Sequence, residues 1–127
     1  MIAKTSKVSY QQFLEIEKKD DDYIYEYIDG YVYCQASPNT IHQKISVILT
    51  SHFQNYFQNK KCEVFHAPFD IKLKNKKETY PRKVVPDLSV ICDIDGLNEL
   101  NYEGVPDLIV EILSPSNQAH DLVTKMN

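Results

Sequence analysis

Two long apolar segments constrain the fold of this chain more than any other feature of its sequence. They are VVPDLSVICD at residues 84–93 and PDLIVEILSP at residues 106–115. Near-continuous apolar runs are typical of strands covered on both faces, because a strand with one face in water alternates apolar and polar residues. The two segments therefore predict neighbouring buried strands within a sheet that is flanked by helices.

The remaining elements follow from local patterns. Asp29-Gly30 between two β-prone runs predicts a β-hairpin over residues 23–36. A broad apolar stripe at 3.6-residue spacing predicts a helix over residues 40–58. The series is completed by a helix over 9–19, a strand over 62–74 and a helix beginning near Gln118. This order indicates an α/β (α+β) protein with a mixed central sheet flanked by helices and an N-terminal β-hairpin.

Composition narrows the class of protein. With 43% hydrophobic and 25% charged residues the chain is typical of a soluble globular domain, and 127 residues fit one domain. No apolar run approaches the ~20 residues of a membrane span, and the N-terminus lacks a hydrophobic signal core. We therefore expect a cytoplasmic protein without membrane contact. The three cysteines are odd in number and lack CxxC spacing, so we expect them to be reduced.

The charge of the chain is unevenly distributed. The net charge is −4, which argues against coating of nucleic acid over the whole surface. Eight of the fourteen basic residues nevertheless fall between Lys60 and Lys83, in a stretch with only three acids. Such a segment can contact a nucleic-acid backbone. A solvated lysine loop is the simpler explanation of the same residues.

Asp87 and Glu111 are carboxylates in the interior of the two apolar segments. A charge inside a buried strand is costly unless it is paired or bound to a cation. If the two strands are neighbours, the carboxylates repel each other, and Mg²⁺ or Mn²⁺ relieves this by taking an oxygen ligand from both. The alternative is that each carboxylate separately accepts a loop amide or pairs with a lysine. The pair together favours a metal site.

Lys125 lies in the helix predicted after the second apolar segment, four residues after Asp121. An ammonium group that reaches the metal end of the strands would offset charge on a phosphate. An ordinary surface Asp-Lys helix pair explains the same spacing.

Several of these blocks together carry a family resemblance. In chain order they are YEYIDGYVY (25–33), SPNTIH (37–42), VVPDLSVICD (84–93), YEGVPDLIVEILSPS (102–116) and the Asp121–Lys125 pair. The chain resembles the Uma-type restriction endonuclease family of the PD-(D/E)XK nuclease superfamily. The resemblance implies a restriction-endonuclease-like core and a Mg²⁺-dependent endonuclease that hydrolyses phosphodiester bonds in DNA. By the same resemblance, the PD of the signature falls on Pro86-Asp87 and its glutamate on Glu111.

Two departures from the family pattern matter. The superfamily's lysine, two residues after the glutamate, is replaced by Leu113. In the family that the chain resembles, a lysine from the following helix substitutes, and Lys125 matches that place. Similar proteins also continue beyond this point, so we expect residues 1–127 to be a single domain that is incomplete at its C-terminus.

Glu26 and His42 are secondary candidates. Glu26 lies within the first strand of the hairpin, where a carboxylate needs a partner, and it is either a third metal ligand or a structural residue. For His42, near the start of its helix, we expect a capping or loop hydrogen bond, because a lone histidine is more often structural than catalytic.

Three functional hypotheses follow. The leading one is a metal-dependent DNA endonuclease with Asp87, Glu111 and Lys125 as catalytic residues. A homodimer is expected in that case, because cutting both strands usually needs two sites. The alternative is a catalytically impaired nuclease fold that acts as a nucleic-acid-binding or assembly module. A hydrolase of another kind is disfavoured, because no serine or cysteine nucleophile arrangement is evident.

Overall fold

A computed structural model of the chain describes residues 2–3, 6–73 and 81–113. Its helices are α1 (Tyr10–Lys19) and α2 (Thr40–Phe57), with a short 3₁₀ helix η1 (Ile94–Gly96). Its strands are β1 (Ile2–Ala3), β2 (Tyr25–Ile28), β3 (Tyr31–Cys34), β4 (Glu63–His66), β5 (Asp70–Leu73), β6 (Arg82–Val84), β7 (Leu88–Ile91), β8 (Asn101–Glu103) and β9 (Leu108–Val110). The predicted mixed α+β class is confirmed. The helix predicted from residue 118, with Lys125, lies outside the described residues.

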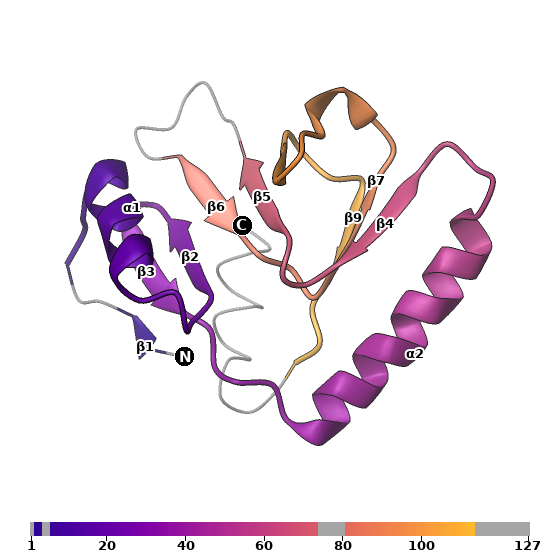
Figure 1. Cartoon of the computed structure of the whole chain (residues 1–127), viewed down its shortest axis with the longest axis horizontal. Coiled ribbons are helices and arrows are strands. Elements are labelled where there is room, and N and C mark those ends of the chain that lie inside the picture. The colour runs from indigo at the N-terminus through magenta and orange to yellow at the C-terminus, as the bar shows by residue number, and fades with distance from the viewer. Residues whose placement is uncertain (1, 4–5, 74–80, 114–127) are drawn as a thin grey trace.

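The strands form two sheets instead of one (Figure 1). The larger has the order β1-β3-β2-β6-β5-β8 and is mixed, since β5 and β8 run parallel while its other pairs are antiparallel. The smaller is antiparallel, with the order β4-β7-β9. Helix α1 lies beside the hairpin of the larger sheet, and α2 lies beside β4 of the smaller one.

The hairpin forms where the sequence predicts it. Ile28 pairs with Tyr31, and the two residues between them have positive φ, 53° at Asp29 and 87° at Gly30. These are the backbone conformations that a two-residue type I′ turn requires, and they explain the Asp-Gly pair. Phe13 of α1 stacks on Tyr27 of the hairpin, with ring centroids 4.9 Å apart, so α1 is fixed to this part of the sheet.

Both sheets meet at a corner where two chain segments pass from one sheet to the other. One segment runs from β4 to β5 and the other from β6 to β7, and each carries a proline there, Pro68 and Pro86. Proline has no N–H to donate to a ladder, so regular pairing is interrupted at both. Between the pairs His66–Leu88 and Ile71–Val84 there are four residues on one segment (67–70) and three on the other (85–87), so the first segment is one residue longer.

The two apolar segments differ in burial. Every residue of β7 is buried, as predicted for the first segment. The prediction of a second strand covered on both faces is wrong, because Leu108 in β9 is 44% exposed. The two runs look alike in sequence, but among the described strands β7 has a neighbour on each side while β9 pairs with β7 alone.

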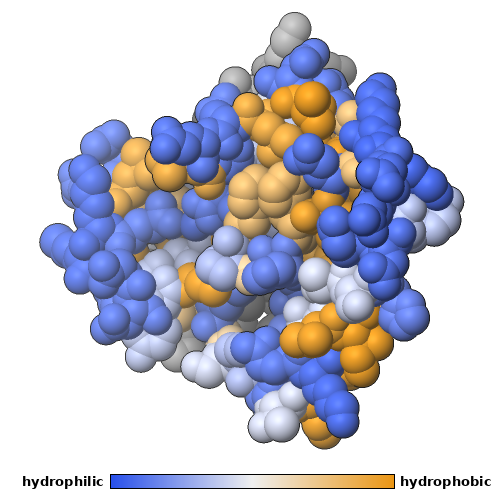
Figure 2. All heavy atoms as spheres, turned by 45° about the vertical axis from the view of Figure 1, so that its right-hand side comes forward, coloured by the Kyte–Doolittle hydropathy of each residue, from blue (hydrophilic) through white to orange (hydrophobic). Residues whose placement is uncertain are grey.

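Helix α2 uses only part of its apolar surface. It begins after the N-cap Asn39, as predicted, and no residue within it is fully buried. One row of apolar side chains on the helix is exposed, formed by Ile41, Ile45, Ile48 and Tyr56. Apolar patches of this kind interrupt the hydrophilic surface in Figure 2. Neither this helix nor any other in the described part of the chain has the length and hydropathy needed to span a bilayer.

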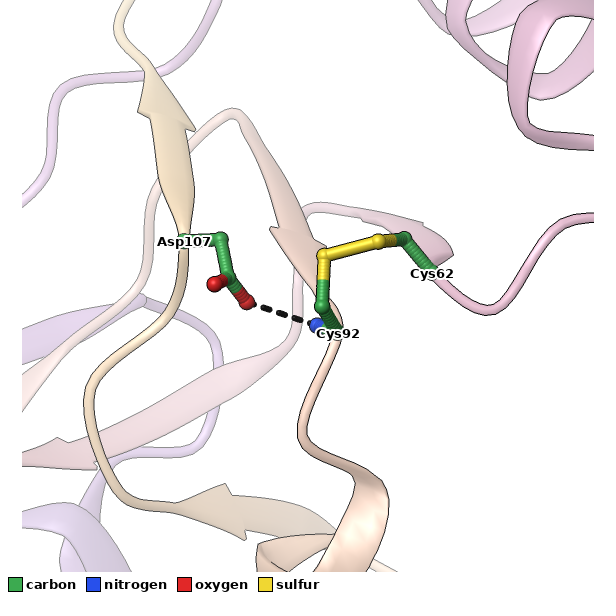
Figure 3. The surroundings of a disulfide bond; sticks show 3 residues. All are labelled: Cys62, Cys92 and Asp107. Carbon is green, nitrogen blue, oxygen red and sulfur yellow. Dashed lines mark hydrogen bonds between the residues drawn. A yellow bond between two sulfur atoms is a disulfide. The ribbon is translucent and has the colours of Figure 1, made fainter.

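A disulfide joins Cys62 and Cys92, so the expectation of three reduced cysteines is wrong for these two (Figure 3). In the antiparallel pairing of β4 with β7, Glu63 lies opposite Ile91. Cys62 and Cys92 are the next residues on the two strands, which places them directly opposite each other. The register that creates this pair depends on residues 30 apart in sequence, and spacing alone does not reveal it. Cys34 is a free, half-buried thiol.

Candidate functional site

A pocket of about 400 Å³ lies at the corner between the two sheets. One wall is the corner itself, with Pro68 and Asp87. Another wall is the first turns of α2 with the segment that leads into it, and the end of β9 supplies Glu111. The pocket therefore lies where the regular pairing of the two segments is interrupted.

The register of the smaller sheet sets Asp87 opposite Glu111. Leu88 pairs with Val110 in the antiparallel ladder of β7 and β9. Asp87 and Glu111 are the next residue on each strand, and both line the pocket. Side chains at directly opposed antiparallel positions share a sheet face, with Cβ atoms roughly 5 Å apart. The strand neighbours predicted from the sequence are therefore confirmed, and they bring the two carboxylates into one pocket.

Both carboxylate oxygens of Asp87 are held by donors. Oδ2 accepts the backbone N–H of Ile112 at 2.7 Å, which ties Asp87 to the residue directly after Glu111. Oδ1 lies 3.1 Å from Nε2 of His42, on the first turn of α2. In addition, the Asp87 carbonyl accepts the N–H of Ala67 at 3.0 Å. Two separate segments of the chain therefore contact the Asp87 carboxylate, and a third holds the Asp87 backbone.

Of the two roles expected for the His42 side chain, the cap is wrong, and the ring instead contacts a residue between β6 and β7. The helix cap is Asn39, whose side chain accepts the backbone N–H of His42 at 2.7 Å. The His42 ring points instead to Asp87 and lines the pocket. One feature of the sequence could have indicated this contact. His42 lies near the start of a helix that follows a loop, and a side chain at such a position can reach the end of a neighbouring strand. Only the fold shows which strand end that is.

Glu26 is placed behind the pocket. It is fully buried in β2, and its Oε2 accepts the backbone N–H of Val85 at 2.8 Å, two residues before Asp87. It is not among the residues that line the pocket. The carboxylate thus supports the segment that carries Asp87, and its role as a metal ligand remains a prediction.

Lysine and arginine are lacking in the described lining of the pocket, where the acidic groups are Asp22, Asp87 and Glu111. The buried lysine of the larger sheet, Lys83, is engaged elsewhere: its Nζ contacts Glu17 at 2.7 Å and the Tyr25 carbonyl at 2.9 Å. Leu113, where the superfamily has its lysine, is 41% exposed. Lys125 lies outside the described residues, so the structure does not place it.

The sequence contains a second Pro-Asp-Leu, and the structure separates the two. Asp107 lies at the other end of β9, where its Oδ2 accepts the N–H of Cys92 at 2.7 Å beside the disulfide (Figure 3). It does not line the pocket. Of the two aspartates with the same local sequence, only Asp87 is positioned opposite Glu111.

The donor chemistry of the pocket fits a hard divalent cation. Mg²⁺ is usually bound by one or two carboxylates and keeps several waters or substrate oxygens as its other ligands. Asp87 and Glu111 supply such a pair. Within residues 6–73 and 81–113, no group of three or more His, Cys, Asp or Glu side chains is arranged to hold a metal. The described part of the chain therefore offers a two-carboxylate site with room for water or phosphate oxygens.

Several known proteins are similar to this chain in sequence or in fold. The family described as "Uma2: Putative restriction endonuclease" matches residues 10–127. The uncharacterized protein slr1290 of Synechocystis is 31% identical over 115 residues, which are 91% of this chain and 58% of that protein. A crystal structure from Anabaena variabilis, described as "a putative nuclease belonging to DUF820", matches with a TM-score of 0.69 at 20% identity.

The coverage of these matches is unequal. The Anabaena match covers 91% of this chain and 63% of the other, so the chain spans less than two thirds of the length of either relative. The TM-score shows a common nuclease-like fold. The family match extends over almost the whole sequence, including both strands of the carboxylate pair. The chain therefore belongs to the Uma2 family, described as that of a putative restriction endonuclease.

Proposed function

We propose that this protein is a Mg²⁺- or Mn²⁺-dependent endonuclease that hydrolyses phosphodiester bonds in DNA. The observation that carries the proposal is the placement of Asp87 and Glu111 at opposed positions of β7 and β9, where both line one pocket. Membership of the Uma2 family supports a nuclease activity. Oxygen donors in a pair suit a hard cation and phosphoryl chemistry.

The charge of the pocket requires a cation before a phosphodiester can enter. Its described charged lining is entirely acidic, so it repels a phosphate group. A divalent cation held by Asp87 and Glu111 would neutralise the charge of these two carboxylates and would give the phosphate a positive partner. When bound, it supplies Lewis-acid polarisation of the phosphate and a lowered pKa for water.

The protein's own residues then have distinct tasks. Asp87 presents a carboxylate whose two oxygens are already oriented by the Ile112 N–H and by His42. Glu111, on the facing strand, supplies the second ligand. Groups held in place before the substrate arrives need no reorganisation during the reaction. Lys125 is proposed to offset the charge that develops on the phosphate, in place of the lysine missing at Leu113.

The experiment is a comparison of conservative variants. Asp87→Asn and Glu111→Gln should each abolish Mg²⁺-dependent cleavage of plasmid DNA and weaken Mn²⁺ binding measured by calorimetry. The matched control is Asp107→Asn, which changes the aspartate of the second Pro-Asp-Leu, away from the pocket. It should keep metal binding and cleavage. Cleavage that persists in both pocket variants would refute the assignment.

A second candidate function is a nuclease-like fold that binds nucleic acid without cutting it. The specific observation in its favour is Leu113 at the position of the superfamily lysine. Calorimetric titration with Mn²⁺, followed by a DNA-binding assay, separates the two functions. DNA affinity without Mn²⁺ affinity would favour the binding module.

We also propose that the active form is a homodimer, because cleavage of both strands of a duplex needs two active sites. Analytical ultracentrifugation in the presence and absence of Mg²⁺ tests this. A monomer that nevertheless makes double-strand breaks at low concentration would contradict it.

A further inference from the structure

We infer that His42 is a positioning residue for Asp87: its ring fixes the orientation of the carboxylate that receives the cation. The inference rests on the proposed function insofar as Asp87 is a metal ligand. It adds a residue that acts through Asp87 without being a ligand. The carrying observation is the 3.1 Å contact between His42 Nε2 and Asp87 Oδ1.

The positioning role requires a proton on a particular atom of the ring. A carboxylate oxygen accepts hydrogen bonds, so His42 must carry a proton on Nε2 to hold Oδ1 in this contact. The other nitrogen, Nδ1, is buried and has no hydrogen-bond partner among the described residues. The polar contact of the ring is thus directed to Asp87, and within the described part of the chain Nδ1 has no hydrogen bond that would orient the ring in another way.

The two donors to Asp87 come from different elements. Ile112 holds Oδ2 from the end of β9, and His42 holds Oδ1 from α2. With one donor the carboxylate can still rotate about its Cβ–Cγ bond, and with two it is held in one orientation. Groups that orient a ligating carboxylate affect metal affinity although they do not touch the metal.

The contact between His42 and Asp87 also links the pocket to helix α2. Asn39 caps this helix at the backbone N–H of the same residue, His42. The ring is therefore carried by the first, capped part of a helix, where the backbone is fixed. A side chain on a capped helix end places its donor more precisely than one on a free loop.

The variants that test the inference differ in where they can place a donor. In His42→Gln the side-chain amide nitrogen can take the place of Nε2. In His42→Asn the shorter side chain places its amide near the position of Nδ1 and does not reach Asp87. His42→Ala removes both ring nitrogens and supplies no side-chain donor. The matched control is His52→Ala, which removes an exposed histidine from the same helix.

The first measurement needs no metal. Long-range ¹H–¹⁵N NMR of the metal-free protein should show the His42 proton on Nε2, protected from exchange, and Asp87→Ala should remove this protection. The second measurement is Mn²⁺ affinity by calorimetry. His42→Ala and His42→Asn should weaken it about tenfold, while His42→Gln should recover most of the loss and His52→Ala should change nothing.

The outcomes separate this inference from the proposed function. A His42 proton on Nδ1, or an Nε2 proton that exchanges as fast as that of exposed His52, overturns the positioning role whether or not metal binds. Equal Mn²⁺ affinities for the Gln and Asn variants also overturn it, since packing alone would then suffice. If the wild-type protein binds no Mn²⁺ but the NMR signature is present, the proposed function fails while the His42–Asp87 bond stands.

Discussion

At the scale of single residues, the site shows how far local sequence can specify chemistry. Asp87 and Asp107 both stand between a proline and a leucine, yet only Asp87 lines the pocket. The difference is set by strand register, which a local pattern does not contain. A charge within an apolar run was enough to predict Asp87 and Glu111. The contact with His42 was not predictable, because it joins residues 45 positions apart.

Glu26 allows a prediction about stability at this scale. Its side chain accepts the N–H of Val85, and Val85 is itself buried. Glu26→Ala leaves that N–H without this acceptor, and we expect a loss of about 2 kcal/mol in the free energy of unfolding. Glu26→Gln keeps an acceptor oxygen and should lose less. Urea unfolding measures both.

The same two variants address the predicted third ligand. Mn²⁺ titration of folded Glu26→Gln shows whether the carboxylate charge itself is needed for metal binding. A stable Glu26→Gln protein with weakened Mn²⁺ affinity would assign Glu26 to the metal. Equal stabilities of the Ala and Gln variants would contradict the support that we ascribe to the Val85 hydrogen bond.

At the scale of elements, the sequence predicted which segments are strands better than how they are joined. The hairpin, both described helices and the strands within 62–74, 84–93 and 106–115 were predictable from turn residues and periodicity, whereas β1 and β8 were not predicted. The division of the segments 62–74 and 84–93 between two sheets was not. Pro68 and Pro86 mark the break, but a proline can equally sit at a strand end, and only the pairing across the corner shows a bend.

The cross-strand disulfide leads to a prediction at this scale. Cys62–Cys92 closes a loop with a sequence separation of 30 residues and joins β4 to β7. Removing such a link increases the entropy of the unfolded chain, so Cys62→Ser should lower the free energy of unfolding by about 3 kcal/mol under oxidising conditions. Urea unfolding with and without dithiothreitol measures this.

The free thiol gives the control for that experiment. Cys34→Ser changes a half-buried cysteine that is not in the disulfide. Its response to dithiothreitol should equal that of the wild-type protein, whereas Cys62→Ser should show no response. If dithiothreitol destabilised Cys62→Ser as much as the wild type, the disulfide would not be the source of the effect.

Helix α2 offers a matched pair of truncations. Ile48 is 48% exposed, while its neighbour Leu49 is half-buried. The two side chains are isomers, so truncation to alanine removes the same atoms from different surroundings. Leu49→Ala should cost about 1–2 kcal/mol and Ile48→Ala less than about 1 kcal/mol. Urea unfolding measures the loss in free energy of unfolding for each variant. A larger loss for Ile48→Ala than for Leu49→Ala would show that the exposed apolar row of α2 is covered in solution.

At the scale of the whole molecule, the two sheets are held together by one hydrophobic cluster that crosses the corner. It joins Ile71 and Val84 of the larger sheet to Ile91 of the smaller one, and Tyr102 of β8 packs in the same cluster. A second cluster around Phe13 and Tyr27 fixes α1 and the hairpin. The length and composition of the chain predicted that it buries a hydrophobic core. The separation of this core into two clusters was not predicted from the sequence.

Tyr102 makes that shared cluster sensitive to alkaline pH. Burial raises the pKa of its phenol above the ordinary value, and the carboxylates of Asp93, Asp107 and Asp95 raise it further. The folded protein therefore holds the phenol proton at a pH where the unfolded chain releases it. The contribution of Tyr102 to the free energy of unfolding should be fully present below about pH 10, the pKa of an unfolded tyrosine, and should be lost as the pH rises through the folded pKa.

The variant Tyr102→Phe isolates this contribution. It keeps the ring in the cluster and removes the ionisable group, together with the long hydrogen bond of 3.5 Å to the Val105 carbonyl. The alkaline decline in its free energy of unfolding should be shallower than that of the wild type. Some decline should remain, because both proteins carry Tyr10 and Tyr25, whose pKa values are also raised. Urea unfolding at a series of pH values from neutral to above 10 gives both curves. The difference between wild type and variant should be constant at neutral pH and should shrink above pH 10. A difference that stays constant throughout would mean that the phenol of Tyr102 titrates alike in the folded and unfolded chains, and that the cluster does not hold its proton.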